Sequence, residues 1–237
     1  MCRKDNDDDI AVPLGVSFVS QHLTAFVSLP SITHLYPWHW SYTLILTPPS
    51  QLTAPAMPTV IRPAVAADVP QLNAIHTYYV ENTISTFALV PYTLEQTSAN
   101  LLAVQSNGLP YIVAVDQDSE EEEIVGYGYL SPFRSAKGGY LHTVELSLYC
   151  HPEHLSRGIG SVMMRKILEV VLHPERFESD WLGESRRGQG RVREVVACMS
   201  VDPAKEADGQ GLARWYGRFG FERAGRLKRV GRKFDQW

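Results

Sequence analysis

One stretch, residues 145–172, constrains the fold of this chain more than any other. An alternating apolar run leads into a short turn with Gly158 and Gly160, and a longer apolar-periodic segment follows. In that segment apolar residues recur at the spacing of one helix face, at Ile159, Val162, Met163, Ile167, Val170 and Val171. The pattern predicts a strand, a glycine turn and a helix that stops near His173 and Pro174.

The two glycines bear on what the start of this helix can bind. Glycine lets the backbone amides there point outward together, and the helix dipole places partial positive charge at that end. A phosphate group suits such a place. Glycine turns also serve simply to join elements, so the turn alone leaves both interpretations open.

Composition excludes several classes of protein. The chain has 237 residues, 44% hydrophobic and 20% charged, which suits one soluble domain with an extension. Its net charge of −4 gives no support to a nucleic-acid surface, and no apolar run is long enough to span a membrane. The three cysteines form no Cys-x-x-Cys pair, and the acidic N-terminus does not suit a targeting peptide. We therefore expect a cytoplasmic protein with no nucleic-acid or membrane partner.

Residues 1–57 differ from the rest of the chain. Prolines recur there with Ser and Thr between them, and no helix or strand period persists. We expect a poorly ordered N-terminal extension over 1–57 and one folded domain over 58–237. Since residues 36–42 are rich in aromatic side chains, a lid or partner-binding arm is the alternative. Met57 is also a candidate for the true first residue.

From residue 59 onward, strands and helices alternate in the pattern. The predicted strands are 59–62, 111–115, 124–130, 140–150, 194–201 and 221–234, and the predicted helices are 69–79, 94–107, 159–172 and 211–219. Asp68 and Thr93 are the expected helix caps, the latter in a capping box with Gln96. The order indicates an α/β (α+β) domain whose mixed, mostly antiparallel sheet is flanked by helices.

The glycine turn resembles the motif (Gln/Arg)-x-x-Gly-x-(Gly/Ala) with which the GNAT superfamily of N-acetyltransferases holds the pyrophosphate of acetyl-CoA. Here the motif reads Leu155-Ser156-Arg157-Gly158-Ile159-Gly160, and Ser161 follows. Both glycines match, and Leu155 replaces the usual polar residue. The resemblance implies the GNAT acyl-CoA N-acyltransferase fold, acetyl-CoA as co-substrate, and cofactor binding by residues 155–161.

Further segments resemble the phosphinothricin acetyltransferase group of that superfamily over about residues 60–237. They are Ile61 to Ala64, Tyr79 to Glu81 with Thr86 and Phe87, Gly126 to Phe133, Tyr140 to Tyr149, Tyr216 to Phe221, and Gly231 to Trp237. The resemblance implies acetyl transfer to the amine of a small molecule, such as an amino acid or a compound like phosphinothricin or methionine sulfoximine.

Acetyl transfer to an amine needs a base and an acid. An ammonium group with a pKa of ~10 must lose a proton before it attacks, and the leaving CoA thiolate takes one up. By resemblance Glu145 is the candidate base, acting through a water, and Tyr216 is the candidate acid. From the residues alone, Glu145 also suits a solvent-facing strand position, and Tyr216 suits plain packing on a helix face.

The resemblance also implies where acetyl-CoA and the acceptor lie. In relatives two strands splay apart at a bulge and bind the cofactor through unpaired backbone groups. That places Leu148, Tyr149 and Cys150 beside the pantetheine arm, with one amide at the oxyanion. We expect Cys150 to be a buried filler and no nucleophile. Candidate contacts to the acceptor are Phe87, Tyr129 and Tyr140.

No group of histidine, cysteine and acidic residues has metal-ligand spacing, so we expect no metal. The acidic run 120–123 reads as a solvated turn, and His151 and His154 are expected only to add charge beside the glycine turn.

Two departures from the phosphinothricin group leave rival functions open. Ala88 follows Phe87 where relatives carry a charged residue, and the chain stops at Trp237 where relatives continue into one more strand. An open edge on the preceding strand would favour a homodimer. The rivals are an acetyltransferase for protein or peptide amines and a CoA-binding relic without catalysis.

Overall fold

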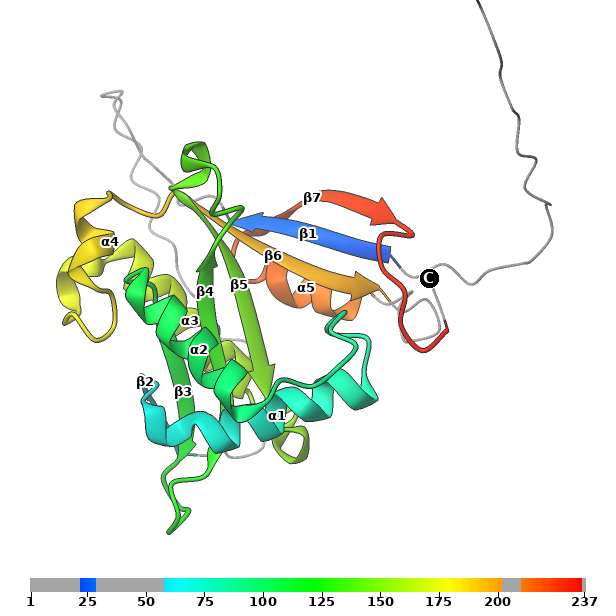
Figure 1. Cartoon of the computed structure of the whole chain (residues 1–237), viewed down its shortest axis with the longest axis horizontal. Coiled ribbons are helices and arrows are strands. Elements are labelled where there is room, and N and C mark those ends of the chain that lie inside the picture. Colours follow the sequence, from blue (N-terminus) through cyan, green and yellow to red (C-terminus); the bar gives the residue numbers. More distant parts are fainter. Residues whose placement is uncertain (1–21, 29–57, 202–209, 236–237) are drawn as a thin grey trace, which may run out of the picture.

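The fold is built on a seven-stranded sheet with the order β2-β3-β4-β5-β6-β1-β7 (Figure 1). The computed structural model describes residues 22–28, 58–201 and 210–235. The strands are β1 (His22–Ser28), β2 (Thr59–Pro63), β3 (Tyr111–Asp116), β4 (Ile124–Pro132), β5 (Thr143–Cys150), β6 (Glu194–Val201) and β7 (Phe221–Lys228). Only β5 and β6 pair in parallel, so the predicted mixed, mostly antiparallel sheet is confirmed.

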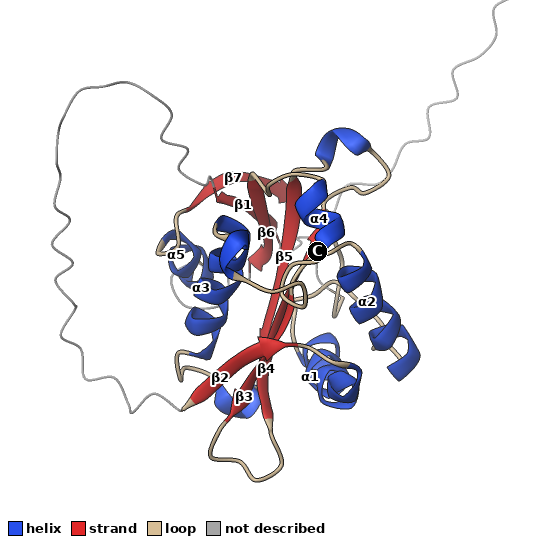
Figure 2. Cartoon of the chain, turned by 90° about the vertical axis from the view of Figure 1, so that its left-hand side faces the viewer, coloured by secondary structure: helices blue, strands red, loops and turns tan. Residues whose placement is uncertain are grey.

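Helices cover both faces of the sheet (Figure 2). They are α1 (Val69–Asn82), α2 (Leu94–Ser106), α3 (Ile159–Leu172), α4 (Glu184–Gly188) and α5 (Gly211–Gly217). α1 and α2 lie on one face, and α3 and α5 lie on the other. The apolar stripe of α3 packs on the sheet, where Met163, Met164 and Ile167 are fully buried. None of the helices in the described ranges is long and apolar enough to cross a membrane.

The two predicted helix caps have different outcomes. At α2 the capping box is present, because Gln96 N donates to Thr93 Oγ1 (3.2 Å) and Thr93 N donates to Gln96 Oε1 (2.9 Å). At α1, Asp68 is the N-cap residue, as predicted, but its side chain makes no capping hydrogen bond to that helix. Its carboxylate is buried, and it instead accepts from Val65 N (2.8 Å) and pairs with Arg62 (2.8 Å). A buried carboxylate is stabilised by such a cation and amide.

β5 and β6 pair only over their first halves. Parallel pairing runs from Thr143 with Glu194 to Leu146 with Ala197, and both strands then continue without pairing with each other. β5 stays paired with β4 as far as Cys150, with no break in register. A gap therefore opens on the β6 side of β5, as expected for a cofactor-binding sheet, although no bulge interrupts this pairing.

β1 is the strand that the sequence did not indicate. His22–Ser28 lies between β6 and β7 and pairs antiparallel with both along its seven residues (Figure 1). For residues 22–28 the prediction of a poorly ordered extension is therefore wrong. The remainder of 1–57 lies outside the described residues. β7 forms the outer edge of the sheet beyond β1, and most of its residues are exposed.

Candidate active site

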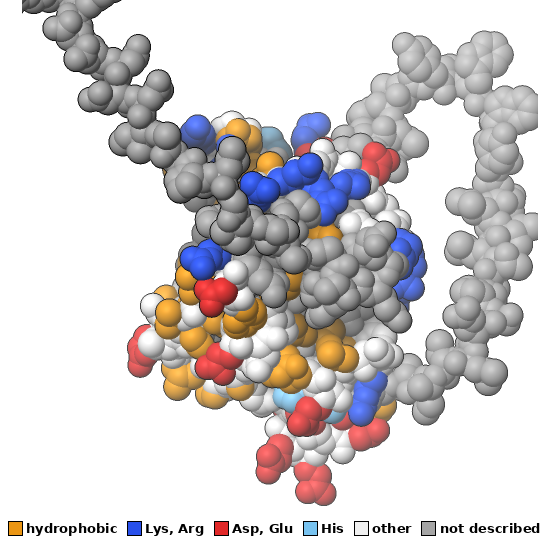
Figure 3. All heavy atoms as spheres, turned by 90° about the vertical axis from the view of Figure 1, so that its right-hand side faces the viewer, with side chains coloured by type: hydrophobic (Ala, Val, Ile, Leu, Met, Phe, Trp, Pro, Cys, Tyr) orange, Lys and Arg blue, Asp and Glu red, His pale blue; other side chains and the backbone are white. Residues whose placement is uncertain are grey.

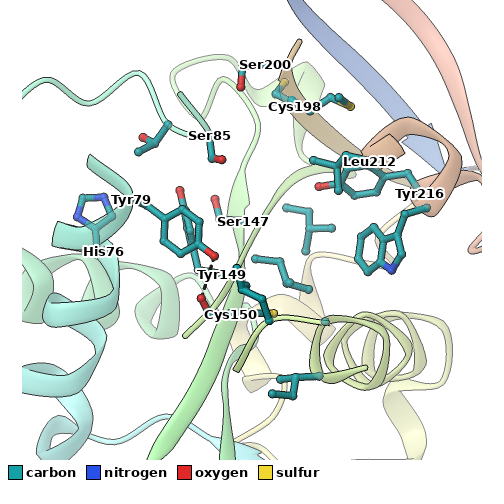
Figure 4. Close-up of a pocket in the computed structure, with 18 of the residues that line it drawn as sticks. His76, Tyr79, Ser85, Ser147, Tyr149, Cys150, Cys198, Ser200, Leu212 and Tyr216 are labelled. Atoms are coloured by element: carbon teal, nitrogen blue, oxygen red, sulfur yellow. Dashed lines mark hydrogen bonds between the residues drawn. The ribbon is translucent and has the colours of Figure 1, made fainter. Parts of the chain in front are cut away.

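A cavity of about 860 Å³ opens where β5 and β6 diverge. Residues of both strands line it, together with the start of α3, part of α5, α1 and the segment 84–87 (Figure 4). Most of the residues predicted from the sequence meet here: Glu145, Tyr216, Leu148, Tyr149, Cys150, Leu155, Ser156, Gly158, Ile159, Gly160, Ser161, Phe87 and Tyr129. The glycine turn and Glu145 thus share one cavity.

Two predicted residues, Tyr140 and Arg157, do not line this cavity. Tyr140 ends the short 3₁₀ turn Gly138–Tyr140, and its ring packs edge-on against Phe133 with centroids 5.5 Å apart. The strand begins only at Thr143, so the alternation predicted for 140–150 does not extend to Tyr140. The side chain of Arg157 is exposed outside the cavity.

The glycine turn has the backbone conformation of an anion site. Gly158 has a φ of +82° and Ser156 a φ of +63°, so both are left-handed. A left-handed residue next to a right-handed helical one, as at Gly158 and Ile159, turns successive amides toward one side and makes a concave site for anions. A Cβ added at Gly158 would meet no atom within 4 Å, so the space beside this residue is open.

Glu145 lies on β5 just before the strands diverge, opposite Val196 of β6. Its carboxylate is half-buried and lies close to the thiol of Cys198, two residues further along β6. Burial and the nearby Glu145 carboxylate raise the pKa of Cys198 to about 11. Glu145 therefore faces the cavity and is not the fully solvated glutamate that strand alternation allowed.

Tyr216 lies across the cavity on α5 and is 7% exposed. Burial, and then the neighbouring Cys198, raise the pKa of its phenol to about 12, so the hydroxyl keeps its proton at neutral pH. The ring also packs against Trp215 (centroids 5.1 Å apart) and Phe221 (5.3 Å). Tyr216 therefore packs against its neighbours and also lines the cavity. Cys198 neighbours both the candidate base and the candidate acid, and sequence reasoning missed it.

Comparison with known proteins identifies the family. The sequence profile of the Acetyltransferase (GNAT) family matches residues 72–197. The chain belongs to the GNAT acetyltransferase family. Phosphinothricin N-acetyltransferase of Streptomyces coelicolor is 31% identical to it over 177 residues, which cover 75% of this chain and 90% of that protein.

Two further similarities extend this result. L-methionine sulfoximine/L-methionine sulfone acetyltransferase of Pseudomonas aeruginosa is 30% identical over 181 residues, covering 76% of this GNAT chain and 90% of that enzyme. The crystal structure of a GNAT superfamily phosphinothricin acetyltransferase from Sinorhizobium meliloti, in complex with AcCoA, matches with a TM-score of 0.60 and 27% identity. That match covers 76% of this chain and 83% of the other. The GNAT fold and the resemblance to phosphinothricin acetyltransferases are confirmed.

The other end of the GNAT cavity is aromatic, and sequence reasoning predicted only part of it. His76 stacks on Tyr92 with ring centroids 4.5 Å apart and meets the Tyr149 ring edge-on at 6.1 Å. The hydroxyl of Tyr79 donates to the carbonyl of Cys150 (2.8 Å), which ties α1 to the end of β5 (Figure 4). His76 and Tyr79 are three residues apart on α1, a helical spacing that could have been noticed.

Lys233 differs from the other basic residues near the C-terminus in being buried. Lysine and arginine side chains gather on one face of the GNAT domain (Figure 3), but Lys233 is only 4% exposed. Its Nζ donates to the carbonyl of Thr86 (2.9 Å), which anchors the C-terminal segment beside the cavity wall. Burial lowers the pKa of Lys233, and burial followed by the charge of Lys233 lowers the pKa of His76.

The lowered pKa of His76 predicts a loss of stability in mild acid. In the unfolded chain His76 becomes protonated as the pH falls below its ordinary pKa of about 6.5. In the folded chain the same imidazole is protonated only at a lower pH. Stability should therefore be complete above that pKa and fall as pH decreases toward the folded value. Thermal melting at pH 7.5 and 5.5 should show this decrease, and His76→Gln should reduce it. If the stability of His76→Gln depended on pH as strongly as that of the parent chain, His76 would not be the cause. His173→Gln is the control and should keep the pH dependence of the parent chain.

Proposed function

We propose that this protein transfers the acetyl group of acetyl-CoA to the amine of a small amino acid or amino-acid analogue, of the phosphinothricin or methionine sulfoximine type. One observation carries the proposal, namely that a single cavity joins the glycine turn to Glu145 and to an aromatic end. The substrates named for the S. coelicolor and P. aeruginosa relatives support the choice of acceptor.

The described residues fit acetyl-CoA as a substrate. The left-handed backbone at Ser156 and Gly158 suits a diphosphate, and the space beside Gly158 is open to receive one. Among the described residues, the edge of β5 that faces β6 has no strand partner beyond Leu146, so backbone groups there are available to pair with the pantetheine arm.

The proposed chemistry is direct transfer. Glu145, through a water, takes a proton from the ammonium group of the acceptor, and the neutral amine attacks the thioester carbon. The new C–N bond forms, the C–S bond breaks, and Tyr216 gives its proton to the departing CoA thiolate. The attacking nitrogen then loses its second proton, which restores the phenol of Tyr216. A backbone amide of 148–150 stabilises the oxyanion. Burial raises the pKa of Cys150 to about 11, which suits a packing residue better than a nucleophile.

The charges around the cavity suit a zwitterionic acceptor. Among the described residues that line it, Glu145 is the only acidic side chain, so it is the natural partner for an ammonium group. The hydroxyl side chains of Ser85 and Thr86 also line it, and the Lys233 ammonium bonds to the carbonyl of Thr86. An anionic group on the acceptor is favoured there over a second cation.

A thiol-release assay tests this function. The chain should release CoA from acetyl-CoA when given phosphinothricin, methionine sulfoximine or methionine sulfone, and products should carry one added acetyl group. Common amino acids and a short peptide with a free N-terminal amine complete the panel. CoA release with the peptide alone would show that the acceptor is a peptide amine. No CoA release with any amine would contradict the proposed acetyltransferase activity.

Gly158→Val should weaken acetyl-CoA binding by ~10-fold or more, because a branched side chain would project into the space assigned to the diphosphate. Gly220→Val is the matched control. Gly220 has the same φ of +82° and no atom within 4 Å of an added Cβ, yet it does not line the cavity. Both variants should lose about 1–2 kcal/mol of stability from left-handed strain. Titration calorimetry should show weakened acetyl-CoA binding only in Gly158→Val. An equal loss of affinity in both variants would contradict diphosphate binding at the glycine turn.

A further inference from the structure

Three potential metal ligands meet beside the glycine turn. Glu123 precedes β4, His151 follows β5, and His154 ends the 3₁₀ turn Pro152–His154. One ligand atom from each side chain lies within 4.8 Å of the others. Sequence spacing did not indicate this group, because Glu123 reaches the histidines only through the antiparallel pairing of β4 with β5.

Backbone hydrogen bonds hold the two histidines in place. His151 N donates to the carbonyl of Val125 (2.8 Å), and His154 N donates to the carbonyl of His151 (3.0 Å). The two imidazole rings are 5.2 Å apart between centroids. All three ligand side chains are partly buried, so they are neither freely mobile nor closed to an ion from solvent.

We propose that Glu123, His151 and His154 bind a divalent transition-metal ion of the Zn²⁺ class. Two imidazoles and one carboxylate are ligands that Zn²⁺ prefers, and a water completes a four-coordinate site. Zinc bonds of ~2.0–2.1 Å in tetrahedral geometry place neighbouring ligand atoms about 3.3 Å apart. His154 Nε2 and Glu123 Oε1 are already 3.0 Å apart, so only His151 must move closer.

The competing explanation is a purely structural pair between His154 and Glu123. His154→Gln separates the two, because the glutamine amide can still donate to the Glu123 carboxylate but is a far poorer zinc ligand. Glu123→Gln is a second variant that keeps hydrogen bonding and removes the ligand charge. His142→Gln is the control, since His142 bonds the carbonyl of Arg191 and lies outside the cluster.

The test is a titration of the tag-free, chelator-treated full chain with ZnCl₂ at pH 7.5. Calorimetry should show a site that His154→Gln and Glu123→Gln each weaken by ~10-fold or more and His142→Gln leaves unchanged. Zn²⁺ should also raise the melting temperature of the parent chain, and Co²⁺ should give the visible absorption of a four-coordinate ion. No saturable binding by the parent chain, or equal affinity in both cluster variants and in His142→Gln, would overturn the site.

Discussion

A chain that begins at Met57 should lose most of its folding stability, because it lacks β1. His22–Ser28 pairs with β6 on one side and β7 on the other, so its removal separates β7 from the sheet. At about 0.5–1.5 kcal/mol for each backbone hydrogen bond, the loss is about 5 kcal/mol or more. That is comparable to the whole stability of a typical domain.

Thermal melting followed by circular dichroism should therefore show no cooperative transition in the Met57 chain, or one lowered by ~10 °C or more. Deletion of residues 1–20 is the matched control, because it leaves β1 in the chain. Ala25→Pro should act like the larger deletion, since proline inside a strand paired on both sides removes a donor and clashes. A Met57 chain that melts like the full chain would show that β1 is dispensable and would favour Met57 as the start.

Glu145→Gln should lower kcat by ~10²–10³-fold at neutral pH, because it removes the proposed base. The dissociation constant for acetyl-CoA should change less than ~3-fold, since glutamine has nearly the same shape as glutamate and can still hydrogen-bond. Steady-state kinetics with the best acceptor, and calorimetry with acetyl-CoA, measure the two quantities separately.

Glu81→Gln is the control for this prediction, because Glu81 is an exposed carboxylate on α1 that does not line the cavity. Unchanged kcat in Glu145→Gln would remove the base from the mechanism. A large loss of acetyl-CoA affinity would instead give Glu145 a role in cofactor binding.

Local signals in the sequence predicted local structure well. The capping box at Thr93, the hairpin of β3 and β4, and the helix α3 all depend on residues close together in the chain. β1 could not be predicted in this way, because its place depends on partners more than 160 residues away, at Val195 and beyond. Pairing of that kind is set by the whole sheet and leaves little trace in a seven-residue segment.

In the candidate site, too, residues in local motifs were predicted and residues placed by long-range contacts were not. The glycine turn is a contiguous motif, and Glu145 and Tyr216 were located by their positions relative to known motifs. Cys198 was missed because its proximity to Glu145 depends on the parallel register of β5 and β6, which are separated in the chain by residues 151–193. The burial of Lys233 could not be predicted from its basic neighbours, because it comes from contacts with the distant segment 84–87.

A crystal structure of the full chain with acetyl-CoA tests the central claim most directly. The diphosphate oxygens should lie within hydrogen-bond distance, about 2.7–3.2 Å, of amides in 156–161. The thioester should lie between Glu145 and Tyr216, at the gap where β5 and β6 separate. Acetyl-CoA bound elsewhere, or bound with its thioester remote from Glu145, would contradict the account.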